Sequence, residues 1–264
     1  MKLKAILFAA ALSGSGTALA GIADTKHNLG STGPGNTVSD TDEICVFCHT
    51  PHGASQDVNA PLWNKAIAPV TYDSYSSTTL DGETASVGHV SLACLSCHDG
   101  TQAMDNIVNS PGSGGYDPTG GGTNGLGYTW TGSGIDTTTG KMLPASSAYI
   151  GPDLTNDHPI GIQYGGGGIT ENTPTAATND TDFNAPESST IDGLTSWWVD
   201  TSAGVAGIRN KTDMILYTRV DFQSGLQEPS VECASCHDPH TSDNATFLRI
   251  SNSESGVCLA CHTK

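Results

Sequence analysis

The sequence predicts a mostly irregular fold of coil with short helices and few short strands. Its 264 residues include 32 Gly and 13 Pro, and charged residues make up only 14%, where about 25% is usual. Glycine and proline interrupt regular elements, so long helices should be scarce. The run from Thr212 to Val220 mixes apolar and β-branched residues, which is typical of a short strand or a short helix. The glycine-rich stretch at about 101–230 is therefore predicted to form loops.

The charge balance excludes one class of partner. The chain has 10 Lys+Arg against 27 Asp+Glu, a formal net charge of -17. Nucleic acid binding needs basic surface to neutralise phosphates, so no nucleic acid partner is expected.

The N-terminus has the pattern of a secretory signal peptide. Lys2 and Lys4 form a positive end, residues 5–12 are apolar, and Ala18-Leu19-Ala20 offers a small-residue cleavage site. A core helix or a membrane anchor is the alternative, but the apolar part is short and Ser-Gly repeats follow it. We expect residues 1–20 to be removed after export through the Sec pathway. Residues 21–264 would remain as a single domain with no membrane span.

All eight cysteines fall into four copies of one motif, Cys-x-x-Cys-His. The copies are Cys45, Cys48 and His49; Cys94, Cys97 and His98; Cys233, Cys236 and His237; Cys258, Cys261 and His262. This pattern is typical of c-type haem attachment, in which two thiols form thioethers with the haem and the histidine is its proximal iron ligand. The sequence therefore predicts four covalently attached c-type haems and a multihaem cytochrome c architecture organised around them.

A zinc site, local disulfides and a redox dithiol site are the alternative roles for the cysteines. The third and fourth pairs have a spacing close to that of a zinc ribbon, but zinc leaves the histidine after each pair unexplained. Local disulfides leave the same histidines without a role. A redox dithiol site would need a thioredoxin-like βαβ pattern, which the sequence does not contain.

Five further histidines can serve as the second axial ligands of four irons: His27, His52, His89, His158 and His240. Met104, Met142 and Met214 are the alternatives, but the surplus of histidine favours bis-His coordination and a low redox potential. His52 and His240 each follow a proximal histidine by three residues, with a proline between, so each should reach a neighbouring haem. His158 precedes a proline that favours an extended loop, and an iron bond would hold His27 in place. His89 lies five residues before Cys94, and we take it as the spare.

Several segments resemble multihaem c-type cytochromes with doubled CxxCH motifs, and among them the tetrahaem extracellular cytochrome filaments of the OmcE type. The resemblance rests on residues 26–29, 45–52, 60–64, 94–100, 156–161, 233–240, 247–249 and 258–262. It implies His27, His52, His158 and His240 as distal ligands. It also implies a homopolymer in which His52 binds the iron of His262 in the next copy.

The predicted function is electron transfer through closely stacked bis-His haems, without enzymatic activity. The resemblance places it in an extracellular conductive filament, with redox partner cytochromes and external electron acceptors as partners. A monomeric shuttle in the periplasm or outside the cell is the alternative. A multihaem reductase would need an iron with an open position, and all four motifs end in His.

Overall fold

The computed structural model describes residues 21–201 and 207–264, so the predicted signal peptide lies outside the described residues. The strands are β1 (Thr37–Val38), β2 (Trp130–Thr131), β3 (Ile162–Gln163), β4 (Glu187–Ile191), β5 (Leu194–Val199), β6 (Met214–Arg219) and β7 (Glu228–Val231). The α-helices are α1 (His89–His98), α2 (Cys233–Cys236) and α3 (Gly256–Cys261). Short 3-10 helices are η1 (Gly21–Asp24), η2 (Cys45–Phe47), η3 (Pro111–Ser113), η4 (Gly122–Asn124), η5 (Tyr164–Gly166), η6 (Ala245–Phe247) and η7 (Ser253–Ser255). Within these ranges, no helix is both long and apolar enough to cross a membrane.

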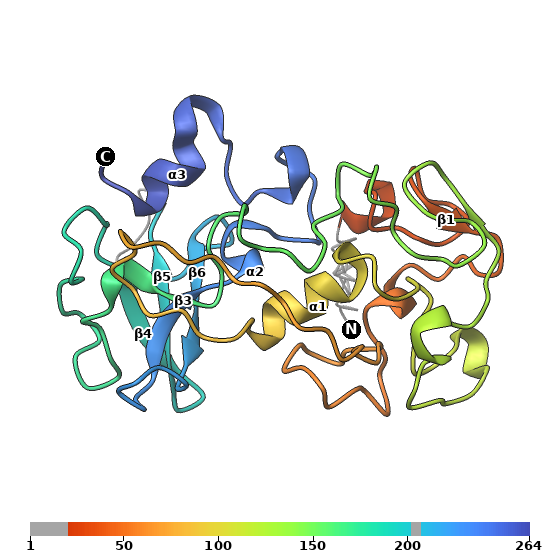
Figure 1. Cartoon of the computed structure of the whole chain (residues 1–264), viewed down its shortest axis with the longest axis horizontal. Helices are drawn as coiled ribbons and strands as arrows, with labels where there is room; N and C mark the ends of the chain where they lie inside the picture. Colours follow the sequence, from red (N-terminus) through yellow and green to blue (C-terminus); the bar gives the residue numbers. More distant parts are fainter. Residues whose placement is uncertain (1–20, 202–206) are drawn as a thin grey trace, which may run out of the picture.

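A five-stranded antiparallel sheet occupies one end of the molecule (Figure 1). Its strand order is β3-β7-β6-β5-β4, so β4 to β7 form a meander and β3 pairs with the last strand. Asp192 and Gly193 form the two-residue turn between β4 and β5, where Ile191 pairs with Leu194. Both turn residues have positive φ, 51° for Asp192 and 80° for Gly193. An Asp-Gly turn with this backbone matches the twist of an antiparallel hairpin.

The predicted fold class is wrong. The structure has two antiparallel sheets, of five and two strands, with about 19% strand and 17% helix. The region predicted as glycine-rich loop contains β2 to β6, and the ambiguous run at 212–220 contains strand β6. The strands were missed because β4 is polar and because Trp197 and Trp198, adjacent in β5, are both buried. Strands of this kind lack the apolar-polar alternation that identifies a half-buried strand.

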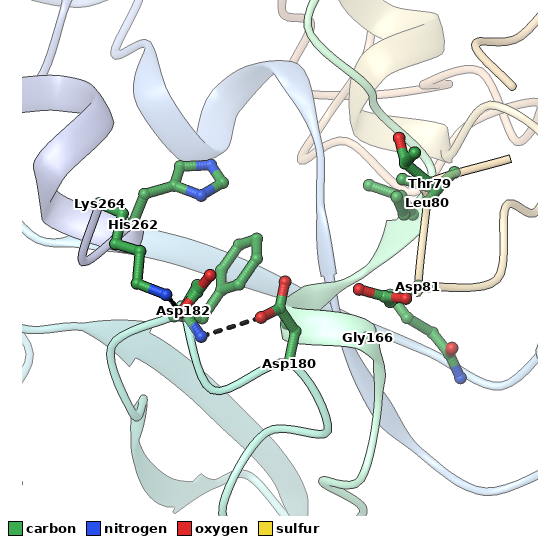
Figure 2. A pocket seen from close by; sticks show the side chains of 13 residues that line it. Thr79, Leu80, Asp81, Gly166, Asp180, Asp182, His262 and Lys264 are labelled. Carbon is green, nitrogen blue, oxygen red and sulfur yellow. Dashed lines mark hydrogen bonds and ion pairs between the residues drawn. The ribbon is translucent and has the colours of Figure 1, made fainter. Parts of the chain in front are cut away.

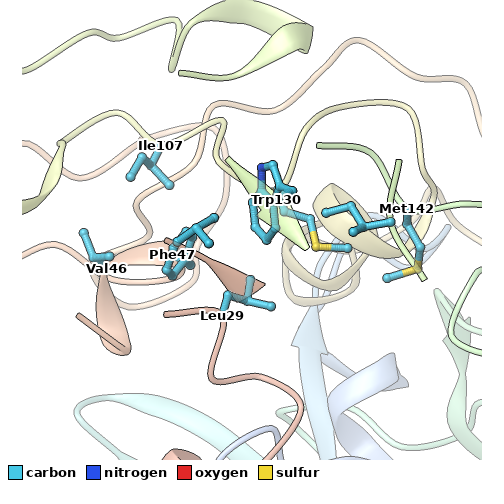
Figure 3. Close-up of a cluster of buried hydrophobic side chains, with 9 residues drawn as sticks. Leu29, Val46, Phe47, Ile107, Trp130 and Met142 are labelled. Carbon is cyan, nitrogen blue, oxygen red and sulfur yellow. The ribbon is translucent and has the colours of Figure 1, made fainter. Parts of the chain in front are cut away.

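The chain builds apolar clusters of its own. The N-terminal cluster is Leu29, Val38, Val46, Phe47, Met104, Ile107, Trp130, Ile135 and Met142. Figure 3 shows Val46 and Phe47 of the first motif within it. The sheet cluster is Tyr164, Ile169, Trp197, Val199, Met214 and Leu216, against which Cys236 and Cys261 pack. Each cluster therefore supports attachment motifs: the N-terminal cluster the first two, the sheet cluster the last two.

Helix α1 lies between the sheet and the N-terminal part of the chain and approaches α2 (Figure 1). Strand β7 ends at Val231, and α2 begins two residues later at Cys233. The sheet thus leads directly into the third motif and places it against the second.

Candidate haem-binding sites

Each cysteine motif lies on or beside a short helical segment. The first motif begins with η2, the second occupies the end of α1, the third forms α2, and the fourth lies at the end of α3. Residues three apart on a helix share a face. Both cysteines of each motif therefore lie on one side of their helical segment, with the histidine following them.

Three of the four motif histidines are oriented by a backbone carbonyl. The Nδ1 atom of His49 lies 2.7 Å from Pro61 O, that of His98 lies 2.7 Å from Ala148 O, and that of His237 lies 2.8 Å from Thr246 O. A carbonyl oxygen only accepts, so Nδ1 carries the proton and Nε2 keeps its lone pair for a metal. The His262 ring packs on Phe183 instead, with ring centroids 4.3 Å apart.

Two motif histidines each face a histidine from outside the motifs. The ring centroids of His49 and His240 are 6.1 Å apart with an interplanar angle of 16°, and those of His27 and His98 are 6.1 Å apart at 84°. Two imidazoles bound to opposite sides of one metal, with metal–nitrogen bonds of about 2.0 Å, have ring centroids about 6.3 Å apart. The centroid distance of each pair is close to this value.

Other contacts orient these two distal candidates. The Nδ1 atom of His27 lies 3.3 Å from Pro239 O, and that of His240 lies 3.2 Å from Asp238 Oδ1. Burial and the nearby His98 lower the pKa of His27 to about 4. Burial likewise lowers the pKa of His98. A neutral imidazole is the form that binds a metal.

Within the described ranges, the three remaining histidines outside the motifs do not form such ring pairs. The Nδ1 atom of His158 lies 3.1 Å from Pro159 O. Burial, and to a lesser extent the nearby His262, lower the pKa of His158. His89 is the first residue of α1, and its Nδ1 atom lies 3.3 Å from Asp57 O. His52 is exposed and accepts hydrogen bonds through its backbone oxygen from Thr50 and Asn109. Among the described residues, no ring faces His52, His89 or His158 at the centroid distance of 6.1 Å that the two histidine pairs have.

The alternative methionine ligands lie in apolar cores. Met104 and Met142 belong to the N-terminal cluster and Met214 to the sheet cluster, with exposed fractions of 2%, 7% and 0%. Their packing accounts for them without a metal.

Neighbouring motifs approach one another through their cysteines. Burial and the nearby Cys97 raise the pKa of Cys48 to about 12, and a hydrogen bond to Cys233 together with burial raises that of Cys94. Burial and the nearby Cys236 raise the pKa of Cys261 to about 12. The contacts thus link the first motif to the second, the second to the third and the third to the fourth.

A cavity of about 310 Å³ borders the fourth motif (Figure 2). Its lining includes His262, Phe183 and three aspartates, and Lys264 Nζ lies 2.6 Å from Asp182 Oδ1. Open space therefore adjoins the motif histidine on this side.

The polar groups that join the second and third motifs could not be predicted from the sequence. Ser91 of α1 and Glu232, the residue before α2, are both buried and hydrogen-bonded to each other. The available signal was local: Glu232 caps α2, with its own N–H donating to Ser235 Oγ. The sequence beside the CxxCH motif could have predicted the capping role of Glu232. It could not have predicted the contact of Glu232 with α1, which is far away in the sequence.

Part of the chain matches a known protein family. A family defined by a doubled CXXCH motif matches residues 228–264, which contain the third and fourth motifs. No curated protein matches the chain. The match supports a c-type cytochrome-like protein, and CXXCH motifs imply covalent binding of c-type haem. It points to a haem-binding electron carrier.

Proposed function

We propose that this protein transfers electrons through four covalent c-type haems, one at each motif and each with two histidine ligands. The observation that carries the proposal is the pairing of His49 with His240 and of His27 with His98 across 6.1 Å. Such a bound haem supplies a reversible one-electron couple at its iron.

The residues of the chain have distinct roles in this proposal. The eight cysteines attach the cofactor, and three of the four motif histidines present Nε2 because carbonyls hold Nδ1. His27, His52, His158 and His240 are the proposed distal ligands, and His89 is the spare. Two histidines on every iron leave no position for a substrate, which favours an electron carrier over a reductase.

The contacts between successive motifs support transfer along a row. Cys48 lies near Cys97, Cys94 lies beside Cys233, and Cys236 lies near Cys258 and Cys261. The four attachment sites are thereby ordered as in the sequence.

The haem number is tested by intact mass after export in a host that matures c-type cytochromes. The polypeptide of residues 21–264 should gain the mass of four haems. Cys94→Ala should lose or weaken the second attachment, because one of its two thioethers is removed. A wild-type mass equal to that of bare polypeptide, or of polypeptide with zinc, would contradict the proposal.

Export and assembly form the finer part of the proposal. The N-terminal pattern supports export, with the cell surface favoured over the periplasm, and the family resemblance supports a homopolymeric filament. His240 and His27 already face two motif histidines, and His158 lies near His262. The exposed His52 is the proposed ligand that a copy donates to the next copy. Because His158 lies near His262, the iron left without a second histidine is that of His237, and not that of His262 as the resemblance implies.

Electron microscopy of the purified protein separates the filament from the monomeric shuttle. Wild-type protein should form filaments. His52→Ala should keep four haems by mass and lose the filaments, because the bond between copies is absent. Filaments of normal length in His52→Ala would reject the role of His52, and monodisperse wild-type particles would favour the shuttle.

A further inference from the structure

A buried carboxylate joins the helices that carry the second and third motifs. Ser91 Oγ of α1 donates to Glu232 Oε2 at 2.5 Å, and Cys233 N donates to Ser91 Oγ at 3.0 Å. The Ser91 hydroxyl is therefore shared between a carboxylate and the backbone of the third motif. Ser91 and Glu232 are 0% and 2% exposed.

An arginine from the sheet completes the arrangement. Arg219 Nη1 lies at the end of β6 and donates to Glu232 Oε1 at 2.9 Å and to Ser86 O, before α1, at 2.7 Å. Arg219 also forms an ion pair with Asp221. A buried carboxylate is tolerated when it is paired and hydrogen-bonded. The two side-chain partners of Glu232 come from different segments, Ser91 from α1 and Arg219 from β6.

The approach of the two segments is close enough to require glycine. A Cβ atom at Gly88, the residue before α1, would lie 2.0 Å from Glu232 Oε1. The Gly88 N–H also bonds to this carboxylate. The start of α1 is thus held directly on Glu232.

The consequence for the attachment sites follows from helix geometry. Cys94 lies three residues after Ser91 and shares its face of α1. Ser91 holds the backbone of Cys233, so Cys94 and Cys233 are brought side by side.

We infer that Glu232, Ser91 and Arg219 are positioning residues that set the distance and mutual orientation of the second and third haem attachment sites. This inference rests on the proposed haem attachment. It assigns to these three side chains the spacing on which electron transfer across the middle of the molecule depends.

The test uses Soret-region circular dichroism of the mature protein, because neighbouring porphyrins couple in a way that depends on their distance and orientation. Glu232→Gln and Ser91→Ala each break one link and keep the side chain close to its original size. Both variants should keep four haems by mass and should lose a large part of the wild-type Soret couplet. Ser91→Ala serves as the second variant should Glu232→Gln fail to fold.

Glu228→Gln is the matched control. Glu228 lies in β7, is 3% exposed, and bonds to Gln163 and Ser224 rather than to α1. It should lower the melting temperature and leave the couplet unchanged. An equal loss of couplet in Glu228→Gln, or an unchanged couplet in both test variants, would overturn the inference. A wild-type mass without haem would instead reject the proposed function itself.

Discussion

The Nδ1 atom of a motif histidine decides which nitrogen of its ring is left for a metal. At His49, His98 and His237 that atom faces a backbone carbonyl at 2.7 to 2.8 Å. Such contacts fix both the tautomer and the ring orientation, and they raise the basicity of the other nitrogen. The carbonyls of Pro61, Ala148 and Thr246 are therefore part of the site, and replacement of a side chain cannot remove them.

At the same scale, His240→Ala should leave one iron of four without its sixth ligand. His240 faces His49 across 6.1 Å, so the haem of the first motif should become high-spin while all four haems stay attached. Electron paramagnetic resonance measures the spin state, and added imidazole should restore the low-spin signal. His89→Ala is the control and should remain fully low-spin. A low-spin spectrum of His240→Ala without imidazole would contradict the pairing.

Among the elements, the hairpin of β4 and β5 depends on its turn. Gly193 has φ 80°, and a Cβ atom there would meet nothing within 4 Å. Gly193→Ala thus adds backbone strain without a clash and should destabilise the protein by about 1 kcal/mol. Gly35→Ala, at a position of ordinary φ where a Cβ has normal contacts, should change the stability little. Chemical denaturation compares the two variants, and equal stabilities would argue against this turn.

For the molecule as a whole, charge opposes association of copies. Copies with a formal net charge of -17 repel one another, and the screening length falls from about 10 Å at 0.1 M salt to about 3 Å at 1 M. Assembly into filaments should therefore become more extensive as the salt concentration rises. Light scattering combined with electron microscopy measures the effect. Filaments that dissolve in high salt would mean that attraction between charges holds them together.

The motifs are easier to recognise in the sequence than the fold. A CxxCH motif is a local pattern whose chemistry needs only adjacent residues, so the sequence alone predicts all eight cysteines as attachment residues, and this stays a prediction. The sheet was missed, although the Asp192-Gly193 turn was a readable hairpin signal.

Contacts between distant segments could not be read at all. Lys65 is 0% exposed, and its Nζ donates to Ala103 O and Met104 O, yet a single lysine in a loop has no pattern that predicts burial. The pairing of His240 with His49 is equally non-local, because it joins the first motif to the third.

The bond between Ser91 and Glu232 also has a consequence in time. The two residues are 141 positions apart, so the chain must close a long loop before α1 and α2 can meet. Contacts of such sequence separation form slowly. A chain that emerges from its N-terminus presents the first two motifs before β7 and α2 exist, so the proposed haem attachment would find these motifs as separate, accessible segments. The centre of the finished molecule is thus assembled late, after its first cysteines have been available for modification.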